Sequence, residues 1–247
     1  NLDRLFLVSA QGALFNTTVI DRVLSIAWRE SIPVTLVLNK SDLGAESLFQ
    51  IYRNLMTDPL QISAKFGTDF ETLERALCDP ALNFIALCGV SGVGKSTILN
   101  RLVPDAARRT QEVSSRTGQG KQTNSETVAY VYDRPGQAPL LIADLPGVQY
   151  FGVSHLTKSD VALSFPEFSL YREKCQYSDC LHMAEPDCAV KSAVAAGQLA
   201  PSRYESYVSM ITELQDLPES RKYRKKGLSA GPRPLQADYK TVKDSRE

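Results

Sequence analysis

The segment GVSGVGKS at residues 89–96 is the feature that most constrains this 247-residue chain. It fits G-x-x-x-x-G-K-[ST], a loop whose backbone N–H groups wrap phosphate oxygens. The apolar run 82–88 before it predicts a buried strand, and the residues from Thr97 predict a helix. In this order the positive end of the helix faces the phosphates. The sequence therefore predicts a nucleoside triphosphate site, and a glycine-rich turn that fits by chance is the alternative.

The last two residues of this pattern carry the chemistry. We expect Lys95 to reach the β- and γ-phosphates and Ser96 to give its hydroxyl to Mg²⁺. The residues expected around the phosphates are Gly89, Val90, Ser91, Gly92, Val93, Gly94, Lys95, Ser96 and Thr97.

A second phosphate-side motif follows the apolar run 139–143. In this D-x-x-G, Asp144 is expected to hold Mg²⁺ through water, and Gly147 to place its N–H at the γ-phosphate. The segment 104–125 is polar, partly basic and without periodicity, which predicts a mobile loop. Its Thr123 is expected to complete the metal shell when the triphosphate is bound.

The motif N-K-x-D, at the end of the apolar run 33–38, indicates which base is bound. The Asp42 carboxylate can accept hydrogen bonds from guanine N1–H and from the exocyclic amine. Adenine has an acceptor at N1, which would leave the carboxylate poorly paired. Asn39 is expected to tie neighbouring loops together, and the stem of Lys40 to cover one face of the base. The alternative is a polar turn that caps the next helix.

A third short motif, Ser63-Ala64-Lys65, follows the strand-like residues 60–62. It matches the S-A-K loop found beside guanine, and its position after N-K-x-D favours GTP over ATP.

The order of these motifs is permuted, because the guanine motifs precede the phosphate loop instead of following it. In the order of its motifs and in their residues, the chain resembles the RsgA (YjeQ) family of circularly permuted, ribosome-associated GTPases. The matching segments are VSA (8–10), LNKSDL (38–43), ISAKFG (62–67), GVSGVGKST (89–97) and AEPDCAVK (184–191).

The resemblance implies hydrolysis of GTP to GDP, stimulated by the small ribosomal subunit during its late maturation. It implies the subunit and its rRNA as partners, and a cytoplasmic location in a bacterium or a chloroplast or mitochondrial one in a eukaryote. An OB-fold usually precedes this region in the family, so we expect part of the RNA-binding surface outside these residues.

Two departures concern catalysis. The family loop G-[RK]-H-T-T-T reads GKQTNS at 120–125, so Gln122 replaces the histidine and its role cannot be carried over. Val148 follows D-x-x-G where many GTPases have the glutamine that orients the attacking water, which predicts slow hydrolysis without a partner. A GTP-sensing ribosome- or RNA-binding module with negligible hydrolysis is therefore the alternative function. A zinc-dependent RNA-binding protein with a vestigial nucleotide site is the third.

Three of the five cysteines form the pattern Cys175-x₄-Cys180-x-His182-x₅-Cys188. Three thiolates and one imidazole suit a closed, structural tetrahedral Zn²⁺ site, and the spacing resembles the family's metal knuckle. The alternatives are a disulfide with a spare thiol, or reduced bystanders. The odd count and the lack of a visible signal peptide argue against disulfides. Cys78 and Cys88 are expected to be small buried hydrophobic residues.

The pattern of elements predicts an α/β fold with a doubly wound, mainly parallel sheet. The expected strands are 4–9, 34–38, 60–63, 83–88, 126–132 and 139–144, and the expected helices are 18–30, 44–56, 69–78, 95–102, 189–196 and 202–216. We expect a GTPase domain at 1–158, a helical zinc-binding domain at 159–227 and a disordered tail at 228–247. The aromatic residues of 202–216 are expected in a core, and His155 on a surface loop.

Charge is balanced overall, with 28 basic and 28 acidic residues, so no global nucleic-acid signature is present. The end of the chain differs, because the basic cluster 221–226 is a candidate contact for rRNA phosphates, with a solvated tail as the alternative. No run approaches the roughly 20 apolar residues of a membrane span. A monomer is expected.

Overall fold

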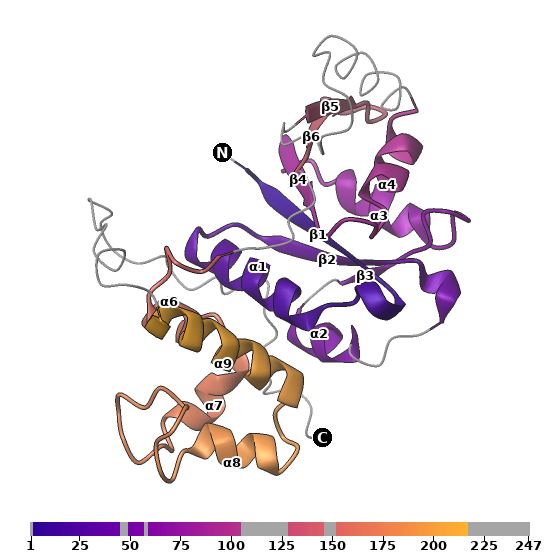
Figure 1. Cartoon of the computed structure of the whole chain (residues 1–247). Helices are drawn as coiled ribbons and strands as arrows, with labels where there is room; N and C mark the ends of the chain where they lie inside the picture. The colour runs from indigo at the N-terminus through magenta and orange to yellow at the C-terminus, as the bar shows by residue number, and fades with distance from the viewer. Residues whose placement is uncertain (1, 45–48, 57–58, 105–127, 146–151, 217–247) are drawn as a thin grey trace, which may run out of the picture. The chain divides into compact units, whose positions relative to one another are not determined.

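The computed structural model describes residues 2–44, 49–56, 59–104, 128–145 and 152–216 (Figure 1). The chain divides into two compact units. The first consists of Asn1–Phe15, Ile32–Phe49 and Asp58–Gln149, and the second of Asn16–Ser31, Gln50–Thr57 and Tyr150–Glu247. The domain limits at 158 and 227 stay predictions.

The first unit is built on a six-stranded sheet with the order β3-β2-β1-β4-β6-β5 (Figure 1). The strands are β1 (Arg4–Ala10), β2 (Val34–Asn39), β3 (Leu60–Gln61), β4 (Phe84–Cys88), β5 (Val128–Tyr132) and β6 (Leu140–Asp144). Among the strands that the structure describes, β5 is antiparallel to β6 and the other pairs are parallel. The sheet extends in both directions from the neighbours β1 and β4, as in doubly wound folds. The predicted mainly parallel sheet is confirmed.

Within its described residues, the first unit has the helical elements η1 (Gly12–Leu14), η2 (Ser41–Leu43), α3 (Phe70–Leu77) and α4 (Lys95–Leu102). Helix α3 buries Phe70, Leu73 and Leu77, which recur at helical spacing on one face. Helix α4 buries Ile98 and Leu99 in the same core. These contacts fix α4 and the loop before it against the strands.

The second unit is helical. It contains α1 (Thr17–Arg29), most of α2 (Phe49–Leu55), α6 (Lys158–Leu163), η3 (Pro166–Phe168), α7 (Ser169–Arg172), α8 (Ala189–Ala195) and α9 (Pro201–Asp216). The predicted helices at 18–30, 189–196 and 202–216 are confirmed within a residue or two. The predicted helix 44–56 was too long, because Gly44 is not helical and α2 is described from Phe49. The sequence did not predict α6, η3 and α7, which are too short to show a period.

Aromatic rings form the centre of the second unit. Phe165 stacks on Phe168 with ring centroids 5.2 Å apart, and it meets Tyr207 edge-on at 5.4 Å. Ile211 and Leu214 on α9 are buried in the same cluster, whereas Tyr204 and Val208 are half-buried against it. The aromatic residues of α9 therefore belong to a core, as predicted. No helix within the described ranges has both the length and the hydropathy to cross a membrane.

Candidate functional site

The phosphate loop (residues 89–94) connects the carboxyl end of β4 to α4, which begins at Lys95. Two of its glycines are required by close approaches. A Cβ at Gly89 would lie 2.1 Å from the Val8 carbonyl oxygen, and a Cβ at Gly94 would lie 2.3 Å from Asn39 Nδ2. Gly94 also has a φ of +100°, which other residues rarely adopt. The loop can therefore approach β1 and the end of β2 only because these positions lack side chains.

Asn39, the last residue of β2, joins three loops. Its Nδ2 donates a hydrogen bond to the Val93 carbonyl oxygen (2.9 Å), and its Oδ1 accepts one from the Ala64 N–H (2.9 Å). The side chain is buried, with 2% of the residue exposed. One amide thus connects the N-K-x-D segment with the phosphate loop and with the S-A-K motif. This is the linkage expected of Asn39.

Asp42 is held by the S-A-K motif. The hydroxyl of Ser63, which is fully buried, donates a hydrogen bond to Asp42 Oδ1. The turn before Asp42 is anchored as well, because the Ser41 N–H donates to the Ile62 carbonyl oxygen (3.1 Å). Lys40 has a φ of +62° in this turn. The Asp42 carboxylate is exposed, but one of its oxygens is fixed in place.

Lys95 is buried and donates hydrogen bonds from Nζ to the carbonyl oxygens of Gly89 (2.8 Å) and Val90 (3.4 Å). Burial lowers the pKa of Lys95, and the charge of Asp144 opposes this effect. Ser96 and Thr97, the next two residues of α4, are exposed. The loop therefore carries a cation within it and an exposed hydroxyl group next to it.

Asp144 ends β6 and lies beside Leu87 in the sheet register, one strand away from the start of the phosphate loop. Burial raises the pKa of Asp144, and Lys95 opposes this effect. Its Oδ1 is buried and accepts no hydrogen bond from the residues that the structure describes. A buried carboxylate oxygen without a donor is suited to a cation or to a cation-bound water.

The structure brings most of the predicted nucleotide residues to one edge of the sheet. Five of them lie at or just after the carboxyl ends of parallel strands, namely Asn39, Asp42, Ser63, Lys95 and Asp144. Ligands bind at this edge in doubly wound sheets. The exposed Lys65 places its Nζ 4.9 Å from the Phe66 ring centre. The predicted residues Thr123 and Gly147 lie outside the described residues, as do Gln122, Val148 and the basic cluster 221–226.

The sequence did not predict the contact between Arg101 and the loop that carries the S-A-K motif. Arg101, in the last turn of α4, reaches the loop that carries the S-A-K motif and lies against Gly67. A basic residue in the last turn of a helix is typical because it complements the helix dipole. Its position therefore gave no reason to expect a contact with the site.

The four predicted metal ligands come together in the second unit. One ligand atom from each of Cys175, Cys180, His182 and Cys188 lies within 4.8 Å of all the others. Cys175 Sγ is 4.0 Å from Cys188 Sγ, and His182 Nδ1 is 3.6 Å and 3.4 Å from these two sulfurs. Tetrahedral Zn²⁺ with ordinary bond lengths separates two sulfurs by about 3.8 Å and sulfur from nitrogen by about 3.6 Å. The cluster therefore has the dimensions of a zinc site.

The surrounding residues fix the turn that carries His182. The N–H groups of Leu181 and Met183 donate to the two carboxylate oxygens of Glu185 (2.9 and 2.8 Å). The hydroxyl of Tyr204 donates to the His182 carbonyl oxygen (2.7 Å). His182 itself has a φ of +58°, and this conformation directs its Nδ1 at the thiols. Outer hydrogen bonds of this kind orient metal ligands.

The sequence also gave expectations for His155, Cys88 and Cys78, and the first two are confirmed. His155 is exposed, and Cys88 is buried, which raises the pKa of its thiol to about 12 and makes it unreactive. Cys78 is half-buried rather than buried, because it lies just after the end of α3.

Comparison with known proteins adds to this geometry. The family model of the RsgA GTPase matches residues 1–154. The chain is 35% identical over 221 residues to the small ribosomal subunit biogenesis GTPase RsgA of Chlorobaculum tepidum, covering 87% of this chain and 69% of that protein. The protein of the same name from Histophilus somni is 32% identical over 230 residues, covering 90% and 64%. The chain thus spans about two thirds of the length of these relatives.

Two solved structures are similar over most of the chain. YjeQ from Thermotoga maritima has a TM-score of 0.66 and 30% identity, covering 88% of this chain and 73% of that one. YloQ, described as a circularly permuted GTPase, has a TM-score of 0.63 and 27% identity, covering 87% and 69%. The predicted permuted α/β fold is confirmed.

Proposed function

The chain belongs to the RsgA GTPase family, and from this premise we propose that it binds GTP with Mg²⁺ and hydrolyses it during maturation of the small ribosomal subunit. The observation that carries the proposal is the pair of hydrogen bonds made by Asn39. They join the phosphate loop to the two segments that carry Asp42 and Ser63. A single ligand can therefore meet a phosphate-binding loop and a guanine-specific carboxylate at once.

In this proposal the base is selected by Asp42. Its carboxylate accepts hydrogen bonds from guanine N1–H and from the exocyclic amine, with Oδ1 oriented by Ser63. Asn39 and Ala64 hold the loops in register, while the stem of Lys40 covers one face of the base. Adenine is rejected because it would leave the carboxylate without its donors.

The phosphates are bound by the N–H groups of the phosphate loop and by Lys95, which exchanges its carbonyl partners for phosphate oxygens. Ser96 and Asp144 would hold Mg²⁺, and this assignment is supported by the buried Oδ1 of Asp144, which has no hydrogen-bond partner among the described residues. When bound, the ion neutralises charge that develops on the phosphates. The sequence assigns Thr123 to the same metal and Gly147 to the γ-phosphate.

In the second unit we propose one structural Zn²⁺ held by Cys175, Cys180, His182 and Cys188. The cluster supports a closed site because four protein ligands fill the tetrahedral shell and leave no position for a substrate. The proposed partner is the small ribosomal subunit, with rRNA phosphates contacted by the basic cluster 221–226.

The test is nucleotide selectivity. Binding of GTP, GDP, ATP and XTP is measured by calorimetry for the wild type and for Asp42→Asn. The wild type is expected to bind GTP and GDP and to reject ATP. The asparagine amide donates where the carboxylate accepted, so Asp42→Asn should lose GTP and gain XTP, whose base has a carbonyl in place of the amine. Equal binding of GTP and ATP by the wild type would overturn the proposal.

A further inference from the structure

We propose that Arg101 is a positioning residue for guanine recognition. It holds the base loop (residues 63–68) against α4, the helix that begins at Lys95. The inference rests on the proposed guanine specificity of Asp42. It adds a residue that belongs to none of the nucleotide motifs and that contacts the base only through the loop it holds.

The guanidinium group of Arg101, an exposed residue, makes three contacts. Nη1 donates a hydrogen bond to the Ala64 carbonyl oxygen (3.4 Å), and Cζ lies 5.0 Å from the centre of the Phe70 ring. On another side the group fills the space beside Gly67, where an added Cβ would be 2.3 Å from Nη2 and 2.9 Å from Cζ. One planar cation therefore contacts the base loop at two points and the first residue of α3 at a third.

Arginine is suited to this position because its charge is planar and carries several donors. A flat guanidinium can lie against both an aromatic ring and a glycine backbone while one N–H bonds a carbonyl oxygen. A lysine ammonium could donate to Ala64, but it is compact and strongly hydrated, and it cannot fill the same flat space. Gly67 completes the arrangement, because any side chain there would meet the guanidinium.

The position of the base loop decides where Asp42 lies. Ser63 begins the loop, and its hydroxyl holds Asp42 Oδ1. The next residue, Ala64, donates its N–H to Asn39, which is bonded to the phosphate loop. Arg101 thus holds the loop from α4, six positions after Lys95, while Asn39 holds it from β2.

This arrangement has a specific consequence for the base. Inosine keeps the N1–H of guanine but lacks the exocyclic amine, so the ratio of the Kd values for IDP and GDP reports the hydrogen bond from the amine to Asp42. A displaced base loop would release Asp42 from its fixed orientation and lower this ratio. Partial unfolding would reduce the fraction of active protein for both nucleotides equally, so it would leave the ratio unchanged.

The experiment measures the IDP to GDP ratio of Kd values for the wild type, Arg101→Ala, Arg101→Lys and Arg75→Ala, with ADP as a further ligand. Arg75 is the matched control, because it is an exposed arginine on α3, the helix that follows the base loop. Arg101 also lies at the surface, so its replacement leaves the core intact.

We expect the ratio to fall about threefold or more in Arg101→Ala, because a hydrogen bond to a charged group discriminates by about tenfold or more. Arg101→Lys should give an intermediate ratio, and Arg75→Ala should match the wild type. An unchanged ratio in Arg101→Ala, or an equal fall in Arg75→Ala, would overturn the inference. If instead the wild type binds ADP as well as GDP, the proposed function itself fails.

Discussion

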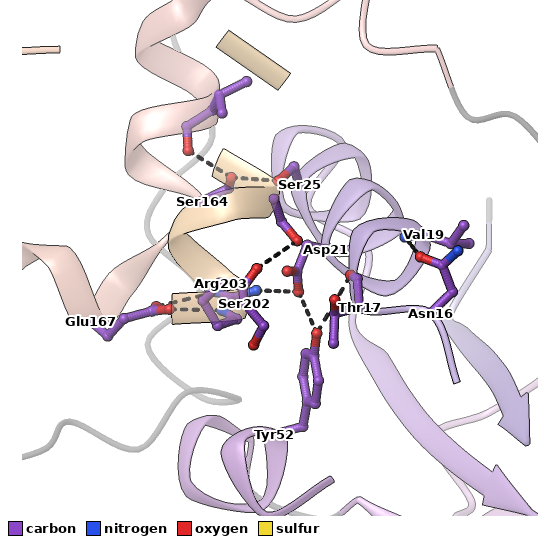
Figure 2. A network of polar contacts seen from close by, with 12 residues as sticks. Asn16, Thr17, Val19, Asp21, Ser25, Tyr52, Ser164, Glu167, Ser202 and Arg203 are labelled. Atoms are coloured by element: carbon purple, nitrogen blue, oxygen red, sulfur yellow. Dashed lines mark hydrogen bonds and ion pairs between the residues drawn. The ribbon is translucent and has the colours of Figure 1, made fainter. Parts of the chain in front are cut away.

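Arg203 of α9 and Asp21 of α1 form an ion pair that is closed to solvent, with side-chain exposures of 3% and 0%. Arg203 also binds Glu167 through two parallel hydrogen bonds, from Nε (2.7 Å) and Nη2 (3.2 Å). The hydroxyl of Tyr52 donates to Asp21 Oδ1 (2.8 Å), so one polar network joins α1, α2, η3 and α9 of the second unit (Figure 2). Asp21 and Glu167 are both carboxylates, and Arg203 is their shared cation.

Replacing Arg203 with alanine should therefore destabilise the second unit strongly. The change leaves two carboxylates buried without their cation, and breaking a buried pair in this way costs about 3–5 kcal/mol. Urea unfolding followed by circular dichroism measures the loss. Arg29→Ala is the control, because the pair of Arg29 with Asp160 (3.5 Å) is partly exposed, at 30% and 17%. Such a pair contributes about 1 kcal/mol or less, and equal losses in the two variants would contradict this account.

The same network predicts an unusual pH dependence. Burial raises the pKa of Asp21, against the opposing charge of Arg203. The folded protein then binds a proton in a pH range where the unfolded chain, with a pKa of about 3.9, has released it. Stability contributed by Asp21 therefore rises as the pH falls through the raised native pKa towards about 4, by at most about 1.4 kcal/mol per pH unit.

Asp21→Asn isolates this effect, because asparagine keeps an oxygen acceptor for Arg203 and Tyr52 but binds no proton. The free energy of unfolding is measured for both proteins from pH 8 down to about pH 4.5, still above the unfolded pKa. The difference should shift in favour of the wild type as the pH falls. A difference that is constant, or that shifts in favour of the variant, would show that Asp21 stays ionised in the folded protein.

The sequence predicted the elements whose signals are local. Most strands of the sheet are largely apolar runs. The residues within each of the motifs 39–42, 63–65 and 89–96 are contiguous in the chain, so the chemistry of each motif could be inferred without a fold. The four residues of the Cys₃His cluster also fall within a short segment. The close approach of Asn39 to Gly94 then follows from parallel strands that end at one edge.

Contacts between distant residues could not be predicted in this way. Asp21 and Arg203 are 182 positions apart, and each alone is typical of a solvated helix face. Their pairing groups α1 with the C-terminal helices in one compact unit, which the order of the chain does not indicate. Arg101 was missed for the same reason, because its partners Ala64 and Gly67 lie more than 30 positions earlier.

Gly94→Ala should weaken nucleotide binding without unfolding the protein. The new Cβ would lie 2.3 Å from Asn39 Nδ2 and would break the bond to Val93. Loss of a buried hydrogen bond costs about 1–3 kcal/mol, so GTP should bind about tenfold more weakly or worse. Gly136→Ala is the matched control. Gly136 also has a positive φ (+71°), but no atom lies within 4 Å of the added Cβ. If Gly94→Ala binds GTP as tightly as Gly136→Ala does, the Asn39 linkage is not required for nucleotide binding and the prediction is wrong.

Cys180→Ser should remove the metal from the second unit. A serine hydroxyl is a poor replacement for a thiolate ligand of zinc, and structural zinc supplies folding free energy directly. The zinc content, measured by atomic absorption, should fall from one ion per chain to a small fraction, and the second unit should unfold at a lower temperature. Cys78→Ser removes a half-buried thiol outside the cluster and should keep the metal. Retention of one zinc per chain in Cys180→Ser would refute the assignment.

GTP turnover should be slow for the isolated protein and fast with small ribosomal subunits. Val148 follows D-x-x-G, and a hydrophobic side chain cannot orient the attacking water as glutamine does. Groups supplied by a partner accelerate GTPases by roughly 10³–10⁵-fold, which lowers the barrier by about 4–7 kcal/mol. Phosphate release from saturating GTP is measured alone, with small subunits and with large subunits as the control. Equal rates in all three mixtures would contradict stimulation, and no release in any of them would favour a GTP-sensing module in place of an enzyme.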